Sequence, residues 1–262
     1  PALLAIAVNL LAIFVMVRLD PASAPLGERM PWRERWAALR GATPVVVLVV
    51  AVFGGLYSGI FTVTEAASVA AVLSLLFALG RGRLNWTLMW QGLRESAAAT
   101  GMIYVMIMGA LIFTYFLNLA RVPEALVEAI AGMQVPPLMI VFVLLVAYLA
   151  LGAIFDEISA MLITLPLVLP VIQKLGQTMM PGVSPEMVAV WWGIINVVII
   201  ELGMIIPPIG IIVFILHGLA PQIAMRTIYR GVTPFIIADL LLLALLTLFP
   251  AIVLLLPRLW PA

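Results

Sequence analysis

Long runs of apolar residues recur along this chain, and they restrict its possible folds more than any other feature of the sequence. A helix needs about 20 consecutive apolar residues to cross the hydrocarbon core of a bilayer, where all of its backbone groups must be hydrogen-bonded within the protein. The runs do not alternate as a membrane-spanning strand would. We therefore predict an all-α integral membrane protein. The runs lie at about residues 2–17, 44–57, 61–79, 97–119, 136–172, 187–219 and 233–256.

Composition supports this class and excludes several others. Hydrophobic residues make up 65% and charged residues 10% of the chain, whereas a soluble domain is roughly half apolar and about a quarter charged. The 13 Lys and Arg are scattered and the net charge is +1, so the chain offers no concentrated basic surface for nucleic acid. The lack of cysteine excludes disulfides, thiolate metal sites and cysteine nucleophiles. Because Pro1 already lies in an apolar run, we expect a longer polypeptide around this chain.

The basic residues predict an orientation, since short cytoplasmic loops carry most Lys and Arg. Ten of the 13 fall in three loops, which we place in the cytoplasm, with Lys174 outside. Under that assignment the run 136–172 begins and ends on the same side, either as a re-entrant hairpin or as two full spans. The ten residues are Arg18, Arg29, Arg33, Arg35, Arg40, Arg81, Arg83, Arg94, Arg226 and Arg230.

Two short segments, at about residues 27–40 and 85–94, have an amphipathic helical pattern with two tryptophans on the apolar face. One interpretation is an ordinary belt of aromatic residues at the membrane surface. The other is a pair of arm helices that lie in the membrane plane. The tryptophans are Trp32 and Trp36 in the first segment, and Trp86 and Trp90 in the second.

The run 136–172 contains two acidic residues near its middle, Asp156 and Glu157, a few residues after Gly152. An ionised carboxylate near the bilayer centre costs about 2.5 kcal/mol or more, so both cannot face lipid. Two half-helices that meet at residues 152–157 would place the acids around a small hydrated cavity. The alternative is a plain loop between two full spans. The short length of each arm, about 16 residues, favours the hairpin.

A second interruption lies in the run 187–219, where Pro207 and Pro208 remove two amide donors between Gly203 and Gly210. An unbroken helix cannot pass through this segment. The carbonyls of about residues 202–206 then become candidates to coordinate a cation, and the helix that starts after Pro208 points its positive end at any bound carboxylate. The alternative is a kink without function. The two prolines, the two glycines and Glu201, which all lie at one level of the run, argue against it.

Two further polar features are expected to be structural. Thr62 or Thr64 is predicted to cap a helix with Glu65 in its first turn, after a tight glycine turn. Asp239 lies about two turns into the last run and is expected to pair within the helix bundle.

At these motifs the sequence resembles the large membrane subunit of tripartite ATP-independent periplasmic transporters, the DctM-like family, over its C-terminal half. The similar stretches follow the family order: GIFTVTEAASVAAV, GAIFDEISAMLITLPLVLPVI, ELGMIIPPIGIIVF and TPFIIADLLLLALLTLFPAIVLLLP. The resemblance implies an inverted-repeat elevator transporter of the bacterial inner membrane. It also implies coupling to Na+ and two partners besides the N-terminal half: a small membrane (Q) subunit and a periplasmic substrate-binding (P) protein.

The resemblance further implies a division of the chain. Residues 1–135 would hold scaffold-type spans with the arm helices, and residues 221–262 the last transmembrane helix. Residues 136–220 would form a transport domain from a hairpin, 136–175, and a broken helix, 187–220.

The resemblance also implies a sodium site where the hairpin tip meets the broken helix. Ile206 stands where the family usually has threonine, so such a site would rely on backbone oxygens. Val63 likewise stands where the family usually has proline. The candidate ion ligands are Gly152, Asp156, Gly203, Met204, Ile206 and Pro207, and the candidate substrate contacts are Glu157, Ser159, Glu201, Pro208 and Gly210.

Two other functions compete with a carboxylate carrier that depends on a binding protein. One is a stand-alone sodium-coupled dicarboxylate or citrate carrier, which keeps the same physics. The other is an intramembrane enzyme, for which Asp156 and Asp239 would have to form an aspartyl pair. The sequence contains no paired HxxxH, no GxSxG and no cysteine, so we predict no enzyme and no cofactor.

Overall fold

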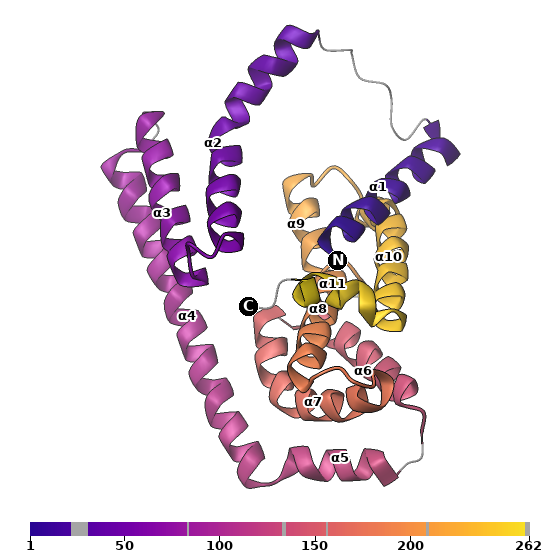
Figure 1. Cartoon of the computed structure of the whole chain (residues 1–262). Coiled ribbons are helices and arrows are strands. Elements are labelled where there is room, and N and C mark those ends of the chain that lie inside the picture. The colour runs from indigo at the N-terminus through magenta and orange to yellow at the C-terminus, as the bar shows by residue number, and fades with distance from the viewer. Residues whose placement is uncertain (22–30, 83, 133–134, 156, 208–209, 260–262) are drawn as a thin grey trace. The chain divides into compact units, whose positions relative to one another are not determined.

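The computed structural model describes residues 1–21, 31–82, 84–132, 135–155, 157–207 and 210–259, and the regular structure within these ranges is helical (Figure 1). Within these described ranges, seven helices are long and apolar enough to cross a membrane, which confirms the predicted all-α membrane class. They are α1 (Ala2–Leu19), α2 (Trp32–Tyr57), α3 (Val63–Gly80), α4 (Trp86–Leu119), α7 (Glu157–Met179), α8 (Pro185–Gly203) and α10 (Met225–Leu248). The shorter helices are α5 (Val122–Gly132), α6 (Pro137–Gly152), α9 (Ile211–Leu219) and α11 (Pro250–Leu259).

The chain folds into two compact units. The large unit consists of residues 1–24 and 104–262, and the small unit consists of residues 25–103. In the large unit α1 packs against α10, and α10 and α11 pack against α8. The expected functional divisions at residues 135 and 221 stay predictions. Sequence position alone could not reveal that the first helix joins the last ones.

The small unit contains a helical hairpin of α2 and α3. Its turn ends in a capping box, in which Thr62 N donates to Glu65 Oε2 at 2.8 Å and Glu65 N donates to Thr62 Oγ1 at 3.4 Å. This confirms Thr62, rather than Thr64, as the predicted cap. At the other end of the hairpin, Arg81 Nη2 donates to the carbonyl of Gly41 at 2.7 Å, which ties the end of α3 to α2.

The two tryptophan segments are the first turns of longer helices. The helix α2 runs from Trp32 to Tyr57 with Pro44 inside it, and Figure 1 shows it bent along its length. The helix α4 begins after Asn85, whose Oδ1 accepts from Leu88 N at 2.8 Å, and continues for 34 residues. Such a helix is about 51 Å long, more than the ~30 Å hydrocarbon core. The described residues of both segments are therefore continuous with longer helices, and an orientation of these turns in the membrane plane stays a prediction.

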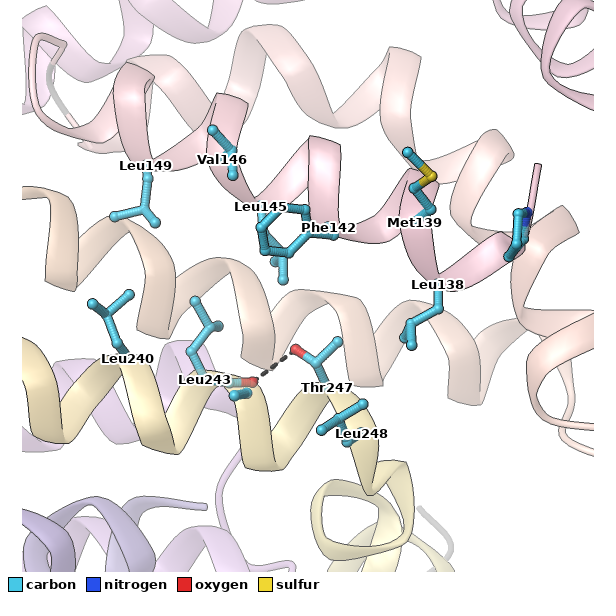
Figure 2. A pocket seen from close by; sticks show the side chains of 12 residues that line it. Leu138, Met139, Phe142, Leu145, Val146, Leu149, Leu240, Leu243, Thr247 and Leu248 are labelled. Carbon is cyan, nitrogen blue, oxygen red and sulfur yellow. Dashed lines mark hydrogen bonds between the residues drawn. The ribbon is translucent and has the colours of Figure 1, made fainter. Parts of the chain in front are cut away.

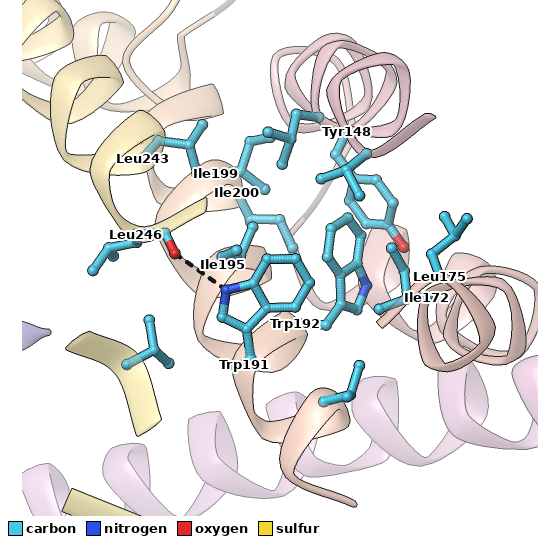
Figure 3. Close-up of a cluster of buried hydrophobic side chains, with 14 of the residues drawn as sticks. Tyr148, Ile172, Leu175, Trp191, Trp192, Ile195, Ile199, Ile200, Leu243 and Leu246 are labelled. Atoms are coloured by element: carbon cyan, nitrogen blue, oxygen red, sulfur yellow. Dashed lines mark hydrogen bonds between the residues drawn. The ribbon is translucent and has the colours of Figure 1, made fainter. Parts of the chain in front are cut away.

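The core of the large unit surrounds α8, which is the most buried of the candidate spans (Figure 3). Trp191 and Trp192 are buried on two sides of this helix. Trp191 Nε1 donates to the carbonyl of Leu246 on α10 at 3.1 Å, and the Trp192 ring meets the ring of Tyr148 on α6 edge-to-face at 5.8 Å. Aromatic anchors thus hold both α6 and α10 against α8.

The expected last transmembrane helix is divided in the structure. The helix α10 ends at Leu248, Phe249 has φ −122° and ψ 71°, and α11 begins at Pro250. Because proline disfavours the helical conformation of the residue before it, the chain turns here instead of continuing. The apolar run from 233 to 256 concealed this break, since Pro250 interrupts neither its hydropathy nor its length.

An apolar groove of about 510 Å³ lies between α6 and α10 (Figure 2). Its polar side chain, Thr247, donates its hydroxyl to the carbonyl of Leu243 at 2.7 Å. The groove therefore presents hydrocarbon along its length.

Candidate functional site

Two helix ends meet in the large unit at a pair of buried glycines, Gly152 and Gly203. A methyl group on Gly203 would lie 2.7 Å from the carbonyl carbon of Gly152 and 2.8 Å from its Cα. A methyl group on Gly152 would lie 3.4 Å from the Cα of Gly203. Only glycine at position 203 allows the end of α8 to touch the end of α6, so the structure brings these two predicted residues together.

The predicted break between residues 203 and 210 is confirmed. After Gly203 the backbone tightens into turns, in which Ile205 N donates to Leu202 O at 3.2 Å and Ile206 N donates to Gly203 O at 3.3 Å. The next helix starts after Gly210, which has φ +53°. That left-handed conformation favours glycine, so Gly210 allows the sharp change of direction.

The sequence predicts that carbonyls in the break lose their hydrogen-bond partners, but several of them keep one. Leu202 O and Gly203 O accept the turn bonds, and Met204 O accepts a hydrogen bond from Ile212 N at 3.2 Å. Each carbonyl oxygen has a second lone pair, so these oxygens keep some capacity to bind a cation.

Oxygen atoms from three residues converge beside Gly210. A methyl group on this glycine would lie 3.3 Å from Ile206 O, 3.4 Å from Ile205 O and 3.4 Å from the hydroxyl of Tyr229 on α10. Sequence reasoning missed Tyr229, because it belongs to no motif and reaches the break only through the packing of α10 against α9. Ile206 contributes its carbonyl, while its side chain packs against the hydrophobic core.

The hairpin tip is only partly described. The turn after α6 is formed by Ala153 N, which donates to Leu149 O at 3.0 Å, and by Phe155 N, which donates to Leu151 O at 2.8 Å. Asp156 and Pro208 lie outside the described residues, as does the side chain of Glu157. These three predictions are therefore untested.

The two arms of the predicted hairpin differ in length. The 16 residues of α6 rise about 24 Å, less than the ~30 Å hydrocarbon core, but the 23 residues of α7 rise about 35 Å. The expectation of two equally short arms is wrong for α7, which continues past residue 175 to Met179 before the chain turns at Gly182, where φ is +81°. A re-entrant path for this segment stays a prediction.

Two predicted substrate residues, Ser159 and Glu201, are not among the nearest neighbours of the glycine contact. Ser159 Oγ lies 3.8 Å from the sulfur of Met106 on α4, and it lines a cavity of about 340 Å³ between α4 and α7. Glu201 is exposed, although its neighbours Ile200 and Leu202 are buried. Neither residue contributes to the oxygen cluster beside Gly210.

Side chains alone do not build a metal centre in the described part of the chain. No group of three or more His, Cys, Asp or Glu residues gathers there. Asp239 instead accepts a hydrogen bond from Asn9 Nδ2 at 3.0 Å, as expected for a residue that pairs within the bundle. Among the described residues, the oxygens that lie closest to Gly210 are the carbonyls of Ile205 and Ile206 and the hydroxyl of Tyr229.

Comparison with known proteins identifies one family. The family model described as "Tripartite ATP-independent periplasmic transporter, DctM component" matches residues 1–252. A C4-dicarboxylate TRAP transporter large permease protein DctM from Pseudomonas aeruginosa is 31% identical over 98% of this chain and 58% of its own length. The sialic acid TRAP transporter large permease protein SiaM from Vibrio cholerae is 28% identical over 97% of this chain and 57% of its own.

The name of a third relative, DctMQ, contains the letters M and Q of two subunits. The isethionate TRAP transporter permease protein DctMQ from Oleidesulfovibrio alaskensis is 31% identical over 84% of this chain and 32% of its own length. These relatives are named as permeases and not as enzymes. The chain spans about half the length of most curated relatives that it matches.

Proposed function

Because the chain belongs to the DctM component family of tripartite ATP-independent periplasmic transporters, we propose that it forms the C-terminal half of a large membrane subunit that imports a small organic acid with Na+. The observation that carries this proposal is the contact between Gly152 and Gly203, where the ends of α6 and α8 meet inside the large unit. Interrupted helices that meet within a membrane protein are typical of the binding sites of secondary transporters.

The coupling ion is proposed to bind beside the break. Na+ is a hard cation and is best held by oxygen ligands, as Ca²⁺ and Mg²⁺ are. The carbonyls of Ile205 and Ile206 and the hydroxyl of Tyr229 approach one point next to Gly210. These oxygens support a cation site that needs no hydroxyl at position 206.

The substrate is proposed to be an organic acid. The relatives are named for C4-dicarboxylate, sialic acid and isethionate, which are all acids. The start of α9 after Gly210 offers the positive end of a helix to such an anion. We propose that residues 136–220 carry the substrate in an elevator-type movement.

The partners are proposed from the family. A small membrane subunit, a periplasmic binding protein and the N-terminal half of the same subunit would complete the transporter. The relative named DctMQ supports a close association with the small membrane subunit. A stand-alone dicarboxylate carrier is the alternative, and dependence on a binding protein distinguishes the two.

The test is uptake into proteoliposomes that contain the full-length subunit with its small membrane subunit. Labelled C4-dicarboxylate, sialic acid and isethionate are offered with an inward Na+ gradient, with and without the binding protein. We expect uptake of one of these acids, and this uptake should require both the Na+ gradient and the binding protein. Uptake without a binding protein would favour the stand-alone carrier, and equal uptake with a K+ gradient would refute coupling to Na+.

A further inference from the structure

A second groove, of about 410 Å³, lies between α1 and α10 in the large unit. It is lined from Val8 to Asp20 on the side of α1 and from Pro234 to Leu241 on α10. Apart from Asp20 at one end, the lining residues are apolar. The groove is therefore shaped to hold a narrow hydrocarbon chain against two helices.

The length of the groove along the helices matches the hydrocarbon thickness of one bilayer leaflet. The hydrogen bond between Asn9 and Asp239 lies near the end of the groove that Val8 and Leu241 form. From Val8 to Leu19 the helix rises about 16 Å. Half of a ~30 Å hydrocarbon core is about 15 Å, so the length of the groove matches an acyl chain within one leaflet.

Basic residues continue the groove at its other end. Arg226 and Arg230 precede Pro234, Ile237 and Leu241 at helical spacing, so all five lie along one face of α10. Both arginines are exposed, and with Thr227 and Thr233 they line a hollow beside the first turns of the helix.

The facing helix carries a third arginine, but this residue does not line the groove. Arg18 lies in the last turn of α1 and is exposed, with its guanidinium 5.6 Å from the centre of the Phe14 ring. Arg226 and Arg230 therefore supply positive charge beside the groove, and Asp20 is the charged residue of its lining. The end of the groove next to these arginines therefore suits a negatively charged group.

We propose that this groove binds an anionic phospholipid, with one acyl chain between α1 and α10 and the phosphate beside Arg226 and Arg230 on α10. Basic pockets beside transmembrane helices bind acidic head groups in this manner. The groove between α6 and α10 is equally apolar, but it has no charged lining residue and gives no reason to choose a lipid. This proposal depends on the membrane location of the chain and not on its transport activity.

The test uses the full-length subunit with its small membrane subunit in nanodiscs of phosphatidylcholine. A small fraction of phosphatidylglycerol with a photoactivatable group at the end of one acyl chain is added, and cross-linked peptides are mapped by mass spectrometry. We expect cross-links concentrated within residues 8–20 and 234–241. The same photoactivatable group on phosphatidylcholine should label these peptides several-fold less.

Two variants separate the head group from the acyl chain. The double variant Arg226→Gln/Arg230→Gln should lower labelling by phosphatidylglycerol at least about fivefold, since each arginine near a membrane surface attracts anionic lipid. Ala12→Trp should fill the groove and lower labelling by both lipids. The controls are Arg94→Gln, at an exposed arginine of the small unit, and Leu10→Trp, on the opposite face of α1; both should label as the wild type does.

Four results would overturn the proposal, and the first three need only the wild type. Equal labelling of the groove by phosphatidylglycerol and phosphatidylcholine would show that the arginines do not select an anionic lipid. Cross-links spread evenly over other helices, or a groove shielded by another polypeptide segment, would show that no lipid occupies it. Unchanged labelling in a folded double arginine variant would likewise refute the site.

Discussion

The side-chain amide of Asn9 donates a hydrogen bond of 3.0 Å to Asp239 Oδ1 and so joins α1 to α10 across 230 positions of sequence. The same amide group also donates to the carbonyl of Ala5 at 3.1 Å. Both donors of one amide are thereby used, and the carboxylate gains a partner between two candidate spans.

Asn9→Leu is expected to destabilise the protein by about 0.6–2 kcal/mol, because it leaves the partly buried carboxylate of Asp239 without this donor. Asp239→Asn should cost less, since an amide oxygen still accepts the bond. Thermal unfolding in detergent measures both variants, with Ser68→Ala at an exposed position as the control. A melting temperature of Asn9→Leu equal to that of the wild type would contradict the pairing.

The glycine contact predicts an order of effects for three alanine substitutions. Gly203→Ala should destabilise by about 1–3 kcal/mol and abolish uptake, because its methyl group would overlap the backbone of Gly152. Gly152→Ala should be milder, since its methyl group would meet other atoms at 3.4 Å or more.

The matched control for this series lies on the same helix as Gly203. Among the described residues, and apart from the neighbouring backbone of α8, no atom lies within 4 Å of a methyl group placed on Gly193. Gly193→Ala should therefore be neutral or stabilise α8 by up to about 1 kcal/mol. Unfolding temperature and uptake are measured for all three variants. If Gly203→Ala behaved like Gly193→Ala, the close contact of α6 and α8 would be refuted.

Features set by neighbouring residues were predictable from the sequence. Proline and glycine act on the backbone within a few residues, so the break after Gly203 could be placed correctly, and the spacing of Thr62 and Glu65 is itself the pattern of a capping box. The break before Pro250 was also local, but it was overlooked within an uninterrupted apolar run.

Features that depend on packing were not predictable. Tyr229 reaches Gly210 from another helix, and Asn9 meets Asp239 only because the first helix packs against α10. Nothing in the local sequence of either residue indicates its partner. The apolar residues that surround them are equally compatible with other arrangements of the same helices.

The topology can be tested directly, because the chain has no cysteine and each introduced thiol is unique in it. Lys174→Cys is expected to react with an impermeant reagent from outside the membrane, whereas Arg35→Cys and Arg226→Cys should react only after permeabilisation. The reason is the concentration of ten of the 13 basic residues in three loops. Labelling of position 35 from outside, in intact cells, would reverse the assignment.

Tyr229→Phe is expected to raise the Na+ concentration for half-maximal uptake about fivefold. It removes one of the oxygen atoms that converge beside Gly210, and a single polar contact is worth about 1 kcal/mol. The control is Tyr115→Phe, at a residue that is 70% exposed on α4. Sodium titration of uptake in proteoliposomes measures both, and an unchanged response in Tyr229→Phe would remove this hydroxyl from the ion site.

The break itself is tested by changing its backbone and its side chains separately. Pro207→Ala restores an amide donor, which can compete for the carbonyls of Gly203 and Met204 and draw the turn toward a regular helix. We expect the Na+ concentration for half-maximal uptake to rise about fivefold, as for the loss of one polar contact. Ile206→Thr leaves the backbone intact and adds a hydroxyl, so it should leave that concentration unchanged or lower it.

The comparison of these two variants decides which atoms hold the ion. The side chain of Ile206 packs against the core and supplies no oxygen, whereas its carbonyl lies beside Gly210. A backbone site therefore responds to Pro207→Ala more strongly than to Ile206→Thr. If Pro207→Ala kept the wild-type sodium response while it folded and transported normally, the break would be a kink without a role in ion binding. The oxygen cluster beside Gly210 would then have to be explained by packing alone.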